Sequence, residues 1–333
     1  MSQPLVRWGI LGCGKIARKF AADLRHVRGA QLSAVAARSQ AAADQFAQEF
    51  PAPFRHGDYE SLVKNSEVDV IYVATPHAFH HAHTLLCLQH GKAVLCEKAF
   101  AINLRQAREM IDLARTRQVF LMEAFWTKFL PHYRRLKAMI AEGRVGHVQS
   151  VIANFGFIPT PPVAPRLYDP ALGGGALLDI GVYPVFLALD LLGKPDRIEA
   201  MMSPSEQHTD RQCAIQFHYD SGAFAQLFCT FTSNLSTGAD IGGDAGRLRL
   251  THRFHGPTAQ LEYYPGIVDT REVIATDPVA GHGYEYEAQH VTDCVREGRT
   301  ESPVMTFADT LLLMETLDTI RAKAGLRYPA DDH

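Results

Sequence analysis

Small residues near the N-terminus have the spacing that holds a pyrophosphate. The pattern Gly12-x-Gly14-x-x-Ala17 follows the apolar, β-prone residues 6–11 and precedes a helix-like pattern. Gly12 permits a tight turn, Gly14 lets a phosphate approach the backbone, and Ala17 lets helix and strand pack closely. The helix start offers unpaired N–H groups and a partial positive charge to the anion. An isolated pattern can be only a turn, but its place after a first strand favours a dinucleotide site. The expected contacts are Gly12, Cys13, Gly14, Lys15 and Ile16.

A guanidinium and a hydroxyl end the next predicted strand, in the sequence Ala37-Arg38-Ser39. An NAD enzyme usually offers Asp or Glu here to the ribose hydroxyls. An acidic residue would repel a 2′-phosphate, whereas Arg38 and Ser39 would bind one. We therefore predict a preference for NADP, with NAD possible. The alternative is a solvated Arg38 beside a helix N-cap at Ser39.

Four histidines follow the predicted strand at 69–75, and a metal site is one interpretation because residues three and four apart share a helix face. They are His77, His80, His81 and His83. We predict no metal, because no acidic or cysteine partner is near in sequence. His81 and His83 fit a solvated helix start. Open α/β sheets bind ligands at the carboxyl ends of their strands. The residues nearest this end of the strand at 69–75, which we expect to contact the cofactor, are Thr75, Pro76, His77 and His80.

Ionisable side chains at two further places could move a proton. Glu97 and Lys98 end a predicted strand at the same sheet edge, where a lysine would lie beside a nicotinamide. Alternatively, Lys98 is an ordinary surface lysine. Asp179 and Tyr183 are four apart on a predicted long helix and so face one way. Alternatively, they are an acid near a helix N-terminus and an amphipathic tyrosine.

The elements that position the first of these groups alternate between strand and helix. Strand patterns occur at 6–11, 32–37, 69–75, 93–96 and 119–123, and helical patterns at 41–50, 80–90 and 104–117. The run 69–75 is almost continuously apolar, which is typical of a strand covered on both faces. Alternating strands and helices imply right-handed βαβ units and a doubly wound parallel sheet. We predict an α/β dinucleotide-binding domain of the Rossmann type at residues 1–124.

The pattern changes after residue 124. Strand patterns occur at 148–157, 198–202, 213–218, 223–232, 248–252 and 260–264, and helical patterns at 133–142, 285–297 and 307–324, with a long helix after Gly173-Gly174-Gly175. Asp220-Ser221-Gly222 has the composition of a hairpin turn between consecutive strands. We therefore predict an α+β domain at residues 125–333 with a large, mostly antiparallel, open sheet.

Composition excludes several classes of partner. The chain has 333 residues, enough for two domains, and its 47% hydrophobic and 21% charged residues are typical of a globular protein. A net charge of −3 gives no electrostatic footprint for nucleic acid. Asp179 and Asp190 interrupt the apolar run 176–192, so we expect a core helix and no membrane span. Six scattered cysteines without a C-x-x-C pair indicate buried thiols in a reducing cytoplasm.

Taken together and in order, these motifs resemble one enzyme family. The glycine turn, Thr75-Pro76-His77-x-x-His80, Glu97-Lys98 and the segment 173–183 are similar to motifs of the glucose–fructose oxidoreductase/inositol dehydrogenase (Gfo/Idh/MocA) family of two-domain NAD(P) enzymes. The segments 122–129 and 177–183 resemble a narrower branch, which contains dimeric trans-dihydrodiol dehydrogenase and NADP-dependent xylose dehydrogenases. The resemblance covers nearly the whole chain. Ala99 departs from it, because the family usually has proline after the Glu-Lys pair.

The resemblance implies roles for the catalytic candidates. Tyr183 would be the general base that takes the hydroxyl proton as hydride passes to the nicotinamide. Its phenol, with a pKa near 10 when free, would be tuned by the ammonium of Lys98. Asp179 would hold Lys98, and His80 would bond the substrate or the nicotinamide ribose. Alternatively, Lys98 itself carries the proton. Glu97 and Lys98 would also contact the cofactor.

We therefore expect an NAD(P)-dependent oxidoreductase that moves a hydride between NADP and a secondary alcohol of a sugar or a vicinal trans-diol. The expected substrate contacts, each equally a core or interface candidate, are Trp126, Phe155, Arg166, Tyr183 and Tyr284. An alternative is a non-catalytic NAD(P)-binding sensor, and another is a sugar–sugar oxidoreductase that keeps its cofactor. The presence of Lys98, Asp179 and Tyr183 favours a catalyst. The resemblance also implies a homodimer through the antiparallel sheet.

Overall fold

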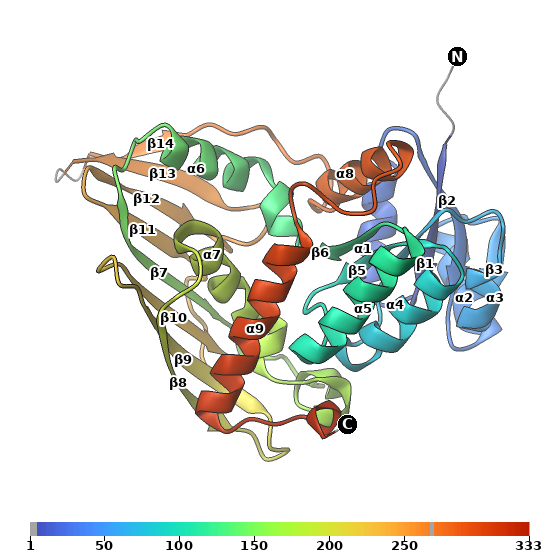
Figure 1. The fold of residues 1–333 in the computed structure, drawn as a ribbon. Helices are drawn as coiled ribbons and strands as arrows, with labels where there is room; N and C mark the ends of the chain where they lie inside the picture. The colour runs from blue at the N-terminus through green and yellow to red at the C-terminus, as the bar shows by residue number, and fades with distance from the viewer. Residues whose placement is uncertain (1–4, 267–269, 333) are drawn as a thin grey trace. The chain divides into compact units, whose positions relative to one another are not determined.

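The computed structural model describes residues 5–266 and 270–332, which pack into two compact units. Unit 1 contains the residues up to Phe129 and the segment Val279–Leu311, and unit 2 contains Leu130–Pro278 and the residues from Leu312 onward. Figure 1 follows the chain through both. The domain division predicted at residue 124 stays a prediction. Packing in the structure groups a late segment of the chain, Val279–Leu311, with the N-terminal residues.

Unit 1 is built on a six-stranded sheet in the order β3-β2-β1-β4-β5-β6, and every neighbouring pair is parallel. This is the order of a doubly wound dinucleotide-binding sheet, so the predicted Rossmann fold is confirmed. The short edge strand β3 had no clear pattern in the sequence. The strands are β1 (Val6–Leu11), β2 (Ala30–Ala36), β3 (Phe54–His56), β4 (Val70–Val73), β5 (Ala93–Glu97) and β6 (Leu121–Ala124).

The helices of unit 1 bury both faces of this sheet. All residues of β4 and β5 are buried, as expected for strands covered on both faces. The helices that pack on the sheet of unit 1 are α1 (Lys15–Leu24), α2 (Gln40–Glu49), α3 (Tyr59–Val63), α4 (His80–Gln89), α5 (Leu104–Arg117) and α8 (Glu285–Arg296). The late helix α8 packs on α1 and β1. There, the indole of Trp8 donates to Thr292 at 3.2 Å, and Asp23 accepts the backbone N–H of Tyr284 at 2.9 Å.

Unit 2 is built on an eight-stranded sheet in the order β14-β13-β12-β11-β7-β10-β9-β8. Only the pair β7–β10 is parallel among its described strands, so the predicted large, mostly antiparallel sheet is confirmed. The sequence patterns did not include β11 or β14. The strands are β7 (Val148–Gly156), β8 (Arg197–Pro204), β9 (Asp210–His218), β10 (Phe224–Thr230), β11 (Ala239–Gly243), β12 (Gly246–Thr251), β13 (Gln260–Pro265) and β14 (Glu272–Ile274).

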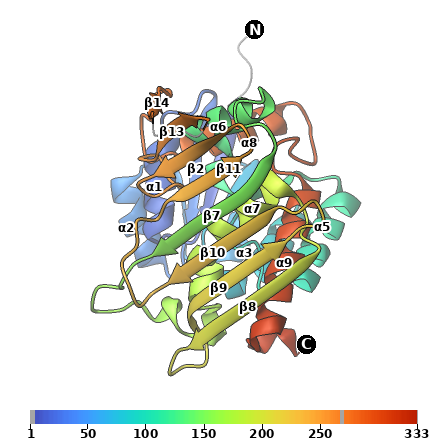
Figure 2. The ribbon, with the colours of Figure 1, turned by 90° about the vertical axis from the view of Figure 1, so that its left-hand side faces the viewer.

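Helix α7 (Val182–Leu192) covers one face of this sheet, where it packs on β7 and β10. Figure 2 shows the opposite face, with β7, β8, β9 and β10 in front. The helix α6 (Pro131–Ala141) lies in the same unit, and α9 (Phe307–Ala324) begins in unit 1 and ends in unit 2. The helical run Pro170–Leu192 is long and apolar enough to cross a membrane, but 78% of its apolar window is buried, as in a core helix.

Candidate active site

The glycine turn joins β1 to α1 with the geometry that the sequence predicts. Gly12 has φ +101°, and a Cβ there would lie 3.0 Å from the carbonyl oxygen of Ala74, so only glycine fits. Gly14 is the N-cap of α1, and a Cβ at this residue would meet no atom within 4 Å. The backbone of Gly14 is therefore open to a ligand at the helix N-terminus. Cys13 lies in this turn, where burial raises the pKa of its thiol to about 11.

Arg38 and Ser39 follow β2 and are both exposed. The Ser39 hydroxyl accepts the backbone N–H of Ala42 at 3.3 Å as the N-cap of α2. The alternative assignment for Ser39, a helix cap, is therefore present in the structure. A capping hydroxyl keeps lone-pair capacity for a second partner, so this does not exclude phosphate binding.

The histidines after β4 each have a different environment. His80 is fully buried, and its ring nitrogens lie 2.8 Å from the carbonyl oxygen of Ala99 and 2.7 Å from that of Thr75. Burial lowers the pKa of His80 to about 4. His81 contacts Glu109 at 2.7 Å, and His83 contacts the Thr75 hydroxyl at 3.0 Å. His80 therefore links the segments that follow β4 and β5. Pro76 and His77 are half-buried at the same strand end.

Glu97 is the last residue of β5, and Lys98 follows it at the carboxyl edge of the sheet. The Tyr72 hydroxyl, from neighbouring β4, donates to Oε1 of Glu97. The backbone N–H of Lys98 lies 3.2 Å from Oε2 of the same carboxylate. Glu97 is buried, whereas Lys98 is half-buried, and the Lys98–Ala99 peptide bond is cis. Two strands thus fix the backbone that carries the lysine.

Two further buried carboxyl groups belong to the same unit. Burial, opposed by the hydroxyl of Thr310 at 2.9 Å, raises the pKa of Glu123 to about 8. Burial and then the charge of Glu97 raise the pKa of Glu287, whose oxygens have no hydrogen-bond partner among the described residues. Glu123 is therefore protonated near neutral pH. Sequence reasoning missed both acids because an isolated Glu in a strand or helix has no pattern.

The predicted long helix after the glycines is present, but its first turn, Leu177–Gly181, is π-helical and leads into α7. π turns occur often at functional sites. Asp179 lies in this turn and accepts Nη1 of Arg166 at 3.0 Å. The Tyr183 ring, in α7, is buried with its centroid 5.9 Å from that of Phe155. The structure thus brings together Arg166 with Asp179, and Phe155 with Tyr183.

Buried polar groups hold the turn Gly173-Gly174-Gly175 in place. The hydroxyl of Tyr328 donates to the carbonyl oxygen of Gly174 at 2.6 Å, and Asp210 accepts the backbone N–H of Leu177 at 2.7 Å. Gly175 has φ +126°, and a Cβ there would lie 2.1 Å from Oδ1 of Asp210. Burial raises the pKa of Asp210 to about 6. The positive φ and the close approach of Asp210 explain why residue 175 is a glycine.

Aromatic contacts in each unit concern the substrate candidates. In unit 1, Trp126 stacks on Tyr284 with centroids 4.6 Å apart and planes 12° apart. In unit 2, the ring of His255 lies 4.3 Å from Phe155 and 4.4 Å from Tyr183. His255 was not predicted, because a single histidine in a loop after β12 has no sequence signal. Its position beside two predicted residues makes it a site candidate.

Comparisons with known proteins agree with this architecture. Residues 6–125 match the family model described as "Oxidoreductase family, NAD-binding Rossmann fold", and residues 133–249 match the "GFO/IDH/MocA C-terminal domain". The chain belongs to the Gfo/Idh/MocA oxidoreductase family. The resemblance read from the motifs is thereby confirmed.

Similar proteins and structures cover nearly the whole chain. The trans-1,2-dihydrobenzene-1,2-diol dehydrogenase of Macaca fascicularis is 37% identical over 98% of this chain and 99% of the relative, and that of Mus musculus is 36% identical over the same shares. A 3-ketoreductase from Actinomadura kijaniata, solved with TDP-benzene and NADP, has a TM-score of 0.85 at 27% identity, covering 96% of this chain and 98% of that one. An aldose–aldose oxidoreductase from Caulobacter crescentus has a TM-score of 0.87 at 22% identity, covering 96% and 98%, and shares the fold.

This protein is therefore an NAD(P)-dependent oxidoreductase that acts on CH–OH groups. The predictions of an oxidoreductase and of an NAD(P)-binding domain are confirmed. The individual site residues, the preference for NADP and the substrate stay predictions.

Proposed function

We propose that this enzyme transfers a hydride between NADP and a secondary alcohol of a sugar or a vicinal trans-diol. The observation that carries the proposal is the pairing in unit 2 of Tyr183 with Phe155 and of Asp179 with Arg166. A phenol, a carboxylate and a guanidinium beside an aromatic ring suit a polyol or an aryl diol, which present hydroxyl groups together with C–H or π surfaces. The name of the relatives, trans-1,2-dihydrobenzene-1,2-diol dehydrogenase, supports the diol class.

The residues of unit 1 fit an NADP molecule. The open backbone at Gly14 and the start of α1 would take the pyrophosphate. Arg38 would bind a 2′-phosphate with charge-assisted hydrogen bonds that a carboxylate could not supply. Further contacts would come from Cys13, Lys15, Ile16, Ser39, Thr75, Pro76, His77, Glu97 and Lys98. When bound, the nicotinamide supplies the hydride acceptor or donor.

In the proposed mechanism, Tyr183 moves the proton of the reacting hydroxyl. Lys98, as an ammonium, lowers the pKa of that phenol and orients the substrate oxygen, since an opposite charge favours the phenolate. Asp179 would hold the ammonium group of Lys98, and in this structure its carboxylate is bound to Arg166. His80 is buried between two carbonyl groups, so we propose that it fixes the backbone around Lys98. The alternative, in which Lys98 carries the proton, uses the same residues.

A substrate screen tests this function directly. Pentoses, hexoses and trans-dihydrodiols are incubated with NADP, and nicotinamide absorbance is followed. We expect reduction of NADP by members of one class and little reduction of NAD at equal concentration. Tight NADP binding without turnover of any compound would contradict the proposal and favour a sensor. NADP that co-purifies with the protein would favour an oxidoreductase that keeps its cofactor.

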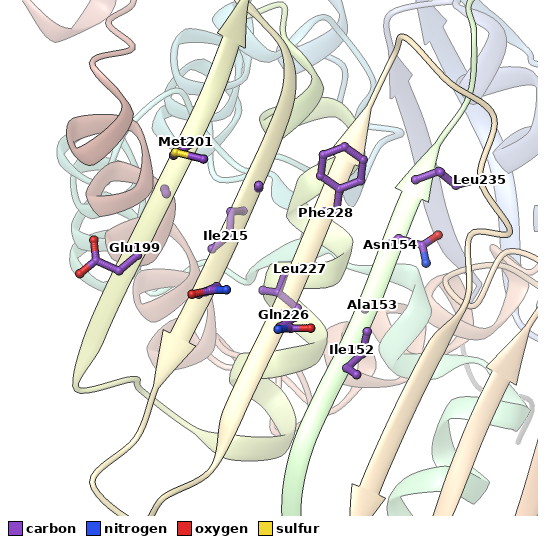
Figure 3. A pocket seen from close by; sticks show the side chains of 13 residues that line it. Ile152, Ala153, Asn154, Glu199, Met201, Ile215, Gln226, Leu227, Phe228 and Leu235 are labelled. Carbon is purple, nitrogen blue, oxygen red and sulfur yellow. The ribbon is translucent and has the colours of Figure 1, made fainter.

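We also propose a cytoplasmic homodimer that pairs through the open face of the unit 2 sheet. This face carries exposed apolar side chains, including Ile152, Phe224 and Met201, whose exposed fractions are 48%, 40% and 75%. Figure 3 shows Ile152 and Met201 on it, with Phe228 between their strands. Met201→Glu should shift sedimentation from a dimer to a monomer. A wild-type protein that sediments as a monomer would contradict this assignment.

A further inference from the structure

A polar cavity at one end of the unit 2 sheet is not explained by the roles above. It lies where β7, β11 and β12 meet two loops, 231–238 and 252–258. Among the described residues, its lining contains hydroxyl, amide, imidazole and guanidinium groups and no carboxylate. The polar lining residues are Asn234, Ser236, Thr237, His252, Arg253 and Thr258. Such a lining suits an anionic group better than a neutral or cationic one.

The backbone of this cavity takes an uncommon conformation. Five non-glycine residues in the described chain have positive φ, and three of them line the cavity: Thr237 at 51°, His252 at 51° and Arg253 at 62°. Left-handed backbone is rare for these residue types, above all for a β-branched one. Such positions gather at functional sites, where the surrounding structure holds them.

Specific hydrogen bonds hold the two loops in this arrangement. The backbone N–H of Phe254 donates to the carbonyl oxygen of Thr237 at 3.0 Å, and the Thr258 hydroxyl donates to that of His252 at 3.3 Å. The backbone N–H of Thr237 donates to the side chain of Asn154 at 3.1 Å. The loops are thus fixed around the cavity before any ligand binds.

The guanidinium of Arg253 has no carboxylate partner within the described part of the chain. Arg247 and Arg249, on the neighbouring strand, both lie within 4.0 Å of Asp240. Arg253 is exposed and lines the cavity instead. A guanidinium binds phosphate or carboxylate oxygens with paired, charge-assisted hydrogen bonds.

The cavity adjoins the proposed reaction site through Phe155. This residue lines the cavity, and its ring stacks on His255 and lies 5.9 Å from that of Tyr183. A substrate whose reacting carbon lies at Tyr183 would therefore extend past Phe155 toward Arg253. The cavity is positioned to receive the end of the substrate that does not react.

We propose that this cavity is a subsite for a negatively charged oxygen group, phosphate or carboxylate, carried by the substrate, with Arg253 as its principal ligand. The proposal rests on the proposed function for the identity of the reacting site. It narrows the substrate class to anionic polyols, such as sugar phosphates or sugar acids.

Calorimetric titration of the NADPH-saturated enzyme tests this subsite without turnover, because the reduced cofactor cannot accept a hydride from the probe. The probes are glucose 6-phosphate, glucuronate and glucose, which separate phosphate, carboxylate and neutral ligands on one ring. We expect at least one anionic probe to bind about tenfold or more tightly than glucose, since hydrogen bonds to charged groups contribute most. Equal binding of all three probes, or no binding by any, would overturn the proposal.

Two substitutions of Arg253 test the contribution of its charge to anion binding while its backbone conformation is kept. Arg253→Gly removes the guanidinium and suits a positive φ, so the fold is kept. It should reduce binding of the anionic probes to the level of glucose, whereas Arg253→Lys should keep part of the preference. The control, Arg135→Ala, removes an equal charge from the surface of α6, where Arg135 pairs with Glu142 at 2.8 Å. An anion preference that survives in Arg253→Gly, or that is lost equally in Arg135→Ala, would overturn the proposal.

Turnover distinguishes failure of this proposal from failure of the proposed function. A neutral sugar or diol that reduces NADP equally well with wild-type enzyme and with Arg253→Gly, together with no anion preference, would reject the subsite and keep the function. Anion binding that depends on Arg253, with no compound oxidised, would keep the subsite and reject the function.

Discussion

The carboxyl end of β5 and the glycine turn before α7 both carry proposed catalytic side chains, but they are held in different ways. Lys98 follows a central strand that is hydrogen-bonded to β4 and β6 along its length. The turn before Asp179 and Tyr183 has no such ladder, and it depends on Asp210 and Tyr328, which are distant in sequence. The first region takes its geometry from hydrogen-bonded ladders to two neighbouring strands, and the second takes it from local backbone hydrogen bonds together with two distant side chains. Removal of one side-chain hydroxyl should therefore disturb the turn before α7 more than the end of β5.

The largest expected effect comes from Tyr183→Phe, which removes only the proposed base. Turnover should fall about 100-fold or more, because general base catalysis contributes on that scale. The dissociation constant for NADP, measured by fluorescence titration, should not change, because the proposed NADP contacts belong to unit 1. Nearly unchanged turnover would exclude the tyrosine as base and leave Lys98 as the proton carrier.

Arg38→Ala tests the cofactor side of the comparison. The ratio of kcat/KM with NADP to kcat/KM with NAD should fall about tenfold or more, because a charge-assisted contact to a phosphate is lost. Arg55→Ala is the matched control, since Arg55 is an exposed arginine of the same unit whose neighbour is Asp44, at 3.8 Å. A ratio that changes equally in both variants would show a general charge effect and no 2′-phosphate contact.

Tyr328→Phe removes the hydroxyl that holds Gly174 and should lower kcat about fivefold, which corresponds to one hydrogen bond. KM for NADP should stay the same. Tyr263→Phe is the control, because its hydroxyl also donates to a backbone carbonyl, that of Arg144, at 2.9 Å. Equal kcat in both variants would show that the turn before α7 does not depend on the Tyr328 hydroxyl.

The smallest effect on activity is expected from Glu123→Gln, which changes the pH dependence of stability. The pKa of Glu123 is raised from 4.5 to about 8, so the folded state keeps a proton that the unfolded state loses over this range. Stability from this group therefore falls as pH rises from about 4.5 to 8 and is constant above. Glutamine is neutral and still accepts from Thr310. The variant should melt several degrees higher than wild type at pH 9 and no higher at pH 4.5, measured by scanning calorimetry. A gain that is the same at both pH values would contradict a buried, protonated Glu123.

The sequence predicted unit 1 more completely than unit 2 for a physical reason. Strand ends in a parallel sheet lie together by topology, so the neighbourhood of Thr75 and Lys98 follows from the order of the elements. The edge strand β3 was missed because it has only three residues and little burial. The hydrogen bond from Tyr72 to Glu97 could not be read, because no spacing relates residues of separate strands.

In unit 2, the large sheet was predictable from alternating burial and tight turns, but its local contacts were not. Asp210, Tyr328 and His255 reach the proposed site from segments without a motif. The π-helical turn at Leu177–Gly181 was missed because its residues have the apolar pattern of an ordinary buried helix. The pairing of Arg166 with Asp179 joins two predicted residues, and their contact depends on how the proline-rich segment 159–170 folds.

The packing of α8 on α1 has a consequence for biosynthesis. The indole N–H of Trp8 and the carboxylate of Asp23 form hydrogen bonds with the segment that follows residue 278. At typical translation rates of about 5–20 residues per second, the ribosome needs on the order of ten seconds or more between the last strand of the first sheet and this helix. During synthesis, the surface of α1 that α8 covers therefore stays exposed until residues 130–278 of unit 2 have been translated.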